Sequence, residues 1–259
     1  MNVFKFRLTN QARASHNLNM FKSTAITKRS TATRSRILST ALTTFRLYGL
    51  DSATMRQISK DAHVALGAAY YYFPSKEAIV QAFYASVQDE HQQRVSAALS
   101  AYETSPDLEA RLRIAFHTKL DILQGDRKLL GALFRYTGEP DHPLSSLGSG
   151  TRPNRDRSIA VFALAIGDEK LPDDIRALLP TALWALHMGI LLYFIYDTSP
   201  NQERTRKLVD GVLDLVVRLL SLVSFPLLKP FRGSLFSLLR DAGLFPEPSS
   251  PAQAAIQEE

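Results

Sequence analysis

Apolar residues in this chain recur at three- and four-residue spacing, the period of an α-helix, and no stretch of useful length alternates like a half-buried strand. The first run ends at Gly49, a residue type that commonly follows the last turn of a helix. Hydrophobic residues make up 45% of the 259, enough to fill a packed core. We therefore expect an all-α fold. The side chains of the first run fall on one helix face: Ile37, Leu38, Ala41, Leu42, Phe45 and Tyr48.

Start and stop signals divide the rest of the chain into further helices. Thr54 stands three residues before Gln57, as in a capping box, and Ser75 is a typical N-cap. At the next start we expect Ser105 to be the cap and Pro106 the first helical residue. The segment 137–154 is rich in Gly, Pro and Ser, so we expect a loop there. The expected helices cover 54–62, 65–72, 75–99, 105–125, 126–136, 158–166, 173–197 (kinked or interrupted at Pro180), 202–224 and a short 234–240.

Positive charge is concentrated at the amino-terminal end. Residues 1–50 hold nine Lys and Arg and no acid, whereas the whole chain has a net charge of +6, so the remainder is net acidic. A basic end on an acidic body favours contact with a polyanion, and a solvated basic tail is the plain alternative. Residues 1–28 also resemble a mitochondrial transit peptide. Alternatively, Met20 could be the true first residue of the protein. We expect this segment to be disordered.

The chain contains no cysteine, which excludes disulfides and thiolate metal sites and fits a reducing cytoplasm. One uncharged stretch, 177–196, approaches the length of a membrane span. It contains Pro180, Thr181 and His187, and no second such span exists. We therefore expect a buried helix and no membrane partner.

Two short helices joined by a tight turn, at 54–62 and 65–72, have the helix-turn-helix pattern. In such a motif the first helix braces against the DNA backbone, and the second enters the major groove with its N-terminal residues near the base edges. Small residues open the second helix here and would allow a close approach to DNA: Ala65, Gly67, Ala68 and Ala69.

A longer pattern runs through residues 30–80. It consists of Thr33-Arg34, Ile37-Leu38, Ala41, Phe45, Gly49, Thr54-Met55-Arg56-Gln57-Ile58-Ser59, Ala62-His63-Val64, Gly67 and Tyr70-Tyr71-Tyr72-Phe73-Pro74-Ser75-Lys76-Glu77. In order and spacing these residues resemble the DNA-binding domain of the TetR (TetR/AcrR) family. This resemblance implies a homodimer on palindromic double-stranded operator DNA, usually a repressor released by a small ligand, with activation left open.

Some positions depart from the family pattern. His63 stands where the turn usually has Gly, and Ala65 replaces the usual Ser or Thr cap, which forfeits about 1 kcal/mol of local stability. Leu66 and Ala68 replace polar residues and could contact thymine methyl groups instead. Tyr70 and Lys76 are expected to contact phosphates, Arg56 and Tyr71 to read bases, and Tyr72 to be either a contact or structural. The expected DNA-binding residues are Arg34, Thr54, Arg56, Ala65, Leu66, Gly67, Ala68, Tyr70, Tyr71 and Lys76.

We expect four parts: a disordered basic tail at 1–29, the DNA-binding domain at 30–80, an effector-binding and dimerisation domain at 81–225, and a partly disordered extension at 226–259. The helices 173–197 and 202–224 are apolar on more than one face. A surface helix needs one apolar stripe, so the excess predicts a twofold interface, with burial inside one subunit as the alternative.

An apolar cavity for a small lipophilic or aromatic effector is expected in the larger domain, although plain core is the alternative. Its expected lining is Phe116, Leu120, Phe134, Trp184, Met188 and Tyr193, with His117, Tyr136 or His187 as polar anchors. His117 and Asp121 have the spacing of a helical metal pair, but without a third ligand we expect no metal. We expect no cofactor and no catalytic residues, because no nucleophile elbow, acid pair or metal constellation occurs. The alternatives to a DNA-binding regulator are an enzyme and a helical adaptor.

Overall fold

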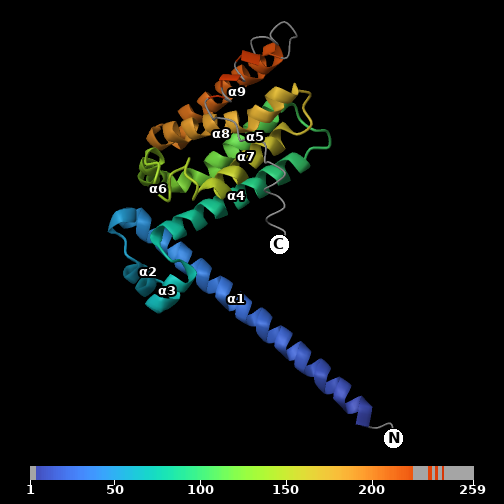
Figure 1. The fold of residues 1–259 in the computed structure, drawn as a ribbon. Helices are drawn as coiled ribbons and strands as arrows, with labels where there is room; N and C mark the ends of the chain where they lie inside the picture. The colour runs from blue at the N-terminus through green and yellow to red at the C-terminus, as the bar shows by residue number, and fades with distance from the viewer. Residues whose placement is uncertain (1–3, 224–232, 235–236, 239–240, 242–259) are drawn as a thin grey trace. The chain divides into compact units, whose positions relative to one another are not determined.

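The computed structural model describes residues 4–223, 233–234, 237–238 and 241, with side chains from Lys28 onward. Every regular element in this described part is a helix, which confirms the expected all-α fold (Figure 1). The chain divides into two compact units, Met1–Tyr84 and Ala85–Glu259. Helix α4, Lys76–Ser100, begins in the first unit and ends in the second.

The first unit contains α1 (Phe4–Ser52), α2 (Met55–Asp61), α3 (Leu66–Tyr72) and the start of α4. Gly49 interrupts α1 with a φ of 79°, a left-handed value that confirms it as the stop of the first helix. Helix α1 also covers most of 1–29, where we expected disorder; that stretch contains no Gly or Pro to break a helix. The core of this unit includes Ile37, Ala41, Phe45, Ile58, Phe73, Ile79 and Val80.

The second unit is a helical bundle. Helix α5 packs against α7, α8 and α9, and α8 also contacts α6, α7 and α9 (Figure 1). The core between these helices includes Leu112, Phe116, Leu120, Phe162 and Phe194. Its elements after α4 are α5 (Leu108–Leu123), α6 (Arg127–Phe134), α7 (Arg152–Ile166), α8 (Asp173–Tyr196) and α9 (Glu203–Val223), with short 3₁₀ turns at Gln124–Asp126, Arg135–Gly138 and Pro200–Gln202.

Several expected boundaries were wrong. The cap of α5 is Asp107, whose Oδ1 accepts from the Ala110 amide at 2.8 Å, so Pro106 precedes the helix. Helix α7 begins at Arg152, well before the expected start at 158, because Pro153 fits the first turn of a helix. Helix α8 is continuous through Pro180; burial of apolar side chains on both sides of it offsets the lost backbone hydrogen bond. The extension 226–259 and the short helix expected at 234–240 lie largely outside the described residues.

Among the described helices, α8 alone is long and apolar enough to cross a membrane. Its buried residues, which include Leu183, His187 and Phe194, pack within the bundle. Core helices of soluble proteins meet the same criterion, so α8 is weak evidence for a membrane span.

Candidate nucleic-acid interface

Helix α2 and the turn after it are shaped by local signals. The Thr54 hydroxyl accepts a hydrogen bond from the Gln57 amide at 3.1 Å and caps α2, as expected. His63 adopts a φ of 52°, which confirms that the turn needs a left-handed residue at this position. Ala65 begins α3 in an extended conformation with no side-chain cap, also as expected. The turn is therefore formed by the backbone conformation of His63 and Ala65, and α3 begins without a side-chain cap.

Helix α3 presents most of its surface to solvent. Ala69 is its only buried residue, and it anchors the helix against the core of the first unit. Gly67 is exposed, Leu66 and Ala68 are half-buried, and 82% of Tyr71 is exposed. Such a short helix, held by one small residue and open on its other faces, is suited to enter a groove.

Gly67 has no packing reason to be a glycine within the described chain. A Cβ built at this position meets no heavy atom within 4 Å, and its φ is not left-handed. Glycine in a helix costs about 0.5–1 kcal/mol relative to alanine. The missing side chain therefore leaves room for something outside the protein to approach α3.

Polar side chains lie exposed around α3. Thr54 and Arg56 are exposed at the start of α2, and 48% of Tyr70 is exposed. Arg34 on α1 is exposed as well, and its guanidinium lies 4.8 Å from the centre of the Phe73 ring. This cation–π contact holds Arg34 close to the end of α3.

Two residues next to this surface have partners inside the protein. The Lys76 ammonium donates to the backbone oxygens of Leu50 at 2.6 Å and Asp51 at 3.2 Å, and so joins the start of α4 to the end of α1. The Lys76 ammonium therefore has a structural position, and its expected contact with phosphate stays a prediction. The Tyr72 hydroxyl lies 3.1 Å from Ser30 Oγ, in agreement with the structural alternative for this residue.

Comparison with known proteins decides the family. Residues 37–83 match the family model for bacterial regulatory proteins of the tetR family, and residues 111–231 match that for the tetracyclin repressor-like C-terminal domain. This chain belongs to the TetR family of transcriptional regulators. No curated protein matches it.

Solved structures of TetR-family regulators share the fold at low identity. A TetR regulator from Nitrosomonas europaea is 17% identical, with 70% of this chain and 96% of that chain covered and a TM-score of 0.56. One from Syntrophomonas wolfei is 16% identical, with 72% and 95% covered and a TM-score of 0.59. One from Streptomyces coelicolor is 17% identical, with 88% and 95% covered and a TM-score of 0.54.

In this TetR-family chain, some expected effector residues meet in the core of the second unit. Phe116 on α5 and His187 on α8 have ring centres 5.8 Å apart, and both side chains are buried. Leu120 and Trp184 are buried as well. Phe162 on α7 joins them, although it was not among the expected residues; its ring lies 5.1 Å from Phe116 and 5.6 Å from His187.

Other expected effector residues lie elsewhere. Tyr136 is stacked on His142 with ring centres 4.0 Å apart, and Arg135 donates to its hydroxyl. Phe134 and Met188 are half-buried, and 42% of Tyr193 is exposed.

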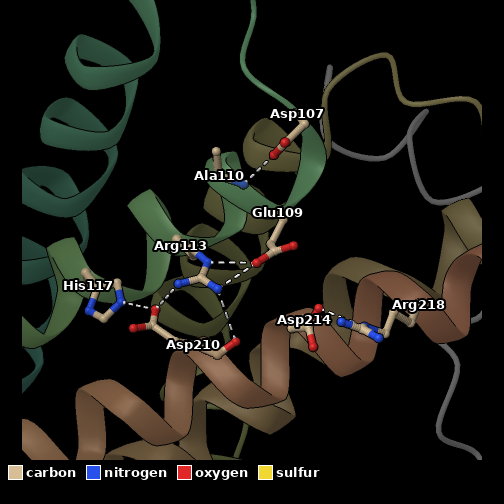
Figure 2. A network of polar contacts seen from close by, with 8 residues as sticks. All are labelled: Asp107, Glu109, Ala110, Arg113, His117, Asp210, Asp214 and Arg218. Atoms are coloured by element: carbon tan, nitrogen blue, oxygen red, sulfur yellow. Dashed lines mark hydrogen bonds and ion pairs between the residues drawn. The ribbon is translucent and has the colours of Figure 1, made fainter.

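His117 belongs to a polar network on the surface between α5 and α9, not to the core (Figure 2). Its Nε2 lies 2.9 Å from Asp210 Oδ1, which also accepts from Arg113 at 2.7 Å. Arg113 is held in turn by Glu109 at 2.6 Å (Figure 2). The network therefore connects α5 to α9. Asp121, the other half of the metal pair considered above, is paired with Arg206, and the described residues contain no group of three metal-ligating side chains.

Lys119 was not among the residues expected in the core, although its position in the sequence indicates burial. It lies three residues after Phe116 and seven after Leu112, and therefore on the apolar face of α5. Only 2% of this lysine is exposed. A lysine within an apolar helical stripe predicts a buried amine, although not which groups surround it.

Proposed function

We propose that this regulator is a ligand-responsive repressor that binds palindromic operator DNA as a homodimer in the cytoplasm. The observation that carries this proposal is α3, a short helix anchored by Ala69 and open at Gly67 and Tyr71. An exposed helix with small residues at its N-terminal end fits the major groove.

The residues on and around α3 have different expected roles in DNA binding. Leu66 and Ala68 contact thymine methyl groups, and Arg56 and Tyr71 bond to base edges. Tyr70, Thr54 and Arg34 contact phosphates and set the register of the protein on the duplex, with Ala65 and Gly67 allowing the approach. Lys76 supports this surface through α1, because its ammonium is held by Leu50 and Asp51.

The dimer would form through the exposed apolar faces of α8 and α9. Helix α9 buries Val209 and Leu213 against its own subunit and exposes a different apolar stripe. A single subunit leaves this stripe in water, whereas a twofold interface would bury it. The exposed apolar residues are Leu192, Tyr193 and Tyr196 on α8 and Leu208, Leu215, Leu219 and Leu222 on α9.

The DNA-binding part is tested by fluorescence anisotropy with DNA from upstream of the coding region, over a series of salt concentrations. Affinity should fall steeply as salt rises, because binding releases counterions from the phosphates. Arg56→Ala should relax discrimination at particular base pairs, whereas Tyr70→Phe should weaken binding equally on all operators. Tyr102→Phe is the matched control, because Tyr102 is an exposed tyrosine of the second unit. A chain without salt-sensitive binding would be an adaptor or an enzyme instead.

The dimer is tested with Leu215→Glu, which places a charge in the middle of the exposed stripe of α9. We expect sedimentation analysis to show dimers for the wild type and monomers for the variant. An unchanged dimer would place the interface elsewhere.

A further inference from the structure

The core of the second unit contains a group of nitrogen-bearing side chains from three helices. Gln88 and His91 lie on α4, Lys119 on α5, and His187 on α8. His91, Lys119 and His187 are all buried. The apolar surroundings include Phe116 and Phe162, whose rings contact His187.

Lys119 is a buried amine without a counter-charge. Its Nζ donates to Gln88 Oε1 at 2.6 Å, and no carboxylate among the described residues pairs with it. An ammonium has three donors, and burying it without an anion is costly. Burial lowers its pKa to about 7, so its charged form is only marginally maintained at neutral pH. None of the residues that the structure describes supplies the anion that would stabilise this charge.

The two histidines also have unused hydrogen-bonding atoms. Neither ring nitrogen of His187 has a partner among the described residues, although only 1% of His187 is exposed. His91 Nε2 lies 2.8 Å from the Ala115 oxygen, whereas its Nδ1 has no partner in the described part of the chain. The pKa of His187 is well below its usual value, first because of burial and then because of the charges of Lys119 and His91. Buried polar atoms are normally paired, so these atoms indicate a missing partner.

We propose that this cluster recognises an organic monocarboxylate, whose oxygens accept hydrogen bonds from Lys119 and His187 and whose apolar remainder lies among Phe116, Phe162 and Trp184. A carboxylate supplies the negative charge that Lys119 lacks and acceptors for the free donors of both residues. The surrounding rings favour an acid with an aromatic or aliphatic body over a small inorganic anion. This inference rests on the proposed ligand response and gives the chemical class of the effector.

Helix α4 offers a route from this site to DNA. An acid bound to the free donors of the Lys119 ammonium lies beside the Gln88 oxygen that the same ammonium holds, and Gln88 lies on α4. The first residue of the same helix, Lys76, holds the end of α1 in the DNA-binding unit. Binding of the acid therefore acts on a helix that both units share.

Trp184 makes direct detection possible, because it is the only tryptophan in the chain and lies one turn from His187 on α8. The probes are benzoate, phenylacetate and octanoate, each compared with its neutral amide. We expect at least one acid to change the Trp184 fluorescence and raise the melting temperature, and its amide to bind at least about tenfold more weakly. Equal binding of acid and amide, or no response to any acid at about 10 mM, would overturn the proposal. A response to chloride or phosphate alone would also overturn it.

Lys119→Met is the decisive variant, with Lys128→Met, at an exposed lysine, as its matched control. We expect Lys119→Met to fold, to melt no lower than the wild type, and to bind the acid at least about tenfold more weakly. Lys119→Gln serves the same purpose if the methionine variant does not fold. Acid affinity that survives both substitutions would refute the assignment.

The DNA-binding assay separates this inference from the proposed function. An acid that binds through Lys119 but does not release DNA supports the site and contradicts the ligand-responsive repressor. If probes release DNA equally from the wild type and from Lys119→Met, the repressor is supported and the carboxylate site is wrong.

Discussion

Asp197 joins α8 to α9, and Asp197→Asn tests how much that junction contributes to stability. The carboxylate is buried and accepts four hydrogen bonds. Two come from Ser199, from the amide at 2.9 Å and the hydroxyl at 2.6 Å. Two come from Thr205 on α9, from the amide at 2.8 Å and the hydroxyl at 2.7 Å. The side chain thus caps α9 while its own amide closes α8.

An asparagine keeps one acceptor oxygen and turns the other position into a donor, so one of the two pairs loses its acceptor. If the Thr205 pair loses its acceptor, the Thr205 hydroxyl can rotate toward another acceptor, but the buried backbone amide of Thr205 cannot. An unsatisfied buried donor costs about 1–3 kcal/mol. The acceptor of the remaining hydrogen bonds is now neutral, which lowers the contribution of each bond to stability from about 1.5–3 to about 1 kcal/mol. We therefore expect the free energy of unfolding to fall by about 2–4 kcal/mol.

Urea unfolding followed by Trp184 fluorescence measures this loss in the second unit. Ser199→Ala should cost about 1 kcal/mol, and Asp168→Asn, at an exposed aspartate, less than about 0.5 kcal/mol. A loss below about 0.5 kcal/mol for Asp197→Asn would refute the reasoning.

The pH dependence gives an independent check. Burial alone would raise the pKa of Asp197, but the hydrogen bonds from Ser199 and Thr205 outweigh it and hold the pKa well below its usual value. The contribution of a carboxylate with a lowered pKa is complete above the unfolded value and is lost as pH falls below it. The difference between the wild type and Asp197→Asn should therefore be constant above about pH 5 and shrink below about pH 4. A difference that persists at lower pH would contradict this account.

Three further substitutions can be tested by urea unfolding followed by far-ultraviolet circular dichroism, which reports on the helices of both units, together with the DNA-binding assay. Gly67→Ala should raise the free energy of unfolding by about 0.5–1 kcal/mol while weakening operator binding, and unchanged binding would show that α3 does not approach DNA closely there. Lys76→Met should lower the free energy of unfolding by about 1–2 kcal/mol, since the backbone oxygens of Leu50 and Asp51 lose their donor. Full stability with weakened DNA binding would favour a phosphate contact for Lys76. Burial lowers the pKa of Lys119 in the folded chain to about 7, whereas the usual pKa of a lysine is about 10. Between these two pH values, Lys119 is protonated in the unfolded chain and mostly neutral in the folded chain. Wild-type stability should therefore rise relative to Lys119→Met across this window, and parallel pH curves for the two proteins would contradict a buried amine.

Local features of the DNA-binding unit could be predicted because each depends on a few neighbouring residues. The stop at Gly49, the cap at Thr54 and the left-handed turn at His63 all follow from backbone preferences within one helical turn. The start of α7 could not be predicted, because a loop rich in Gly and Pro conceals a proline that suits a first helical turn. Prediction of the helices was therefore reliable where a single residue type decides the backbone.

The amino-acid sequence by itself determined the helical fold, the turn between α2 and α3, and the family. Only the tertiary structure decided which polar side chains meet. Lys119 finds Gln88 across 31 positions of the chain, and Lys76 finds Leu50 across 26. His117, which could have faced the core, instead pairs with Asp210 across 93 positions. Periodicity shows which face of a helix is buried, but the partners on that face come from other helices, and their positions depend on how the whole bundle packs.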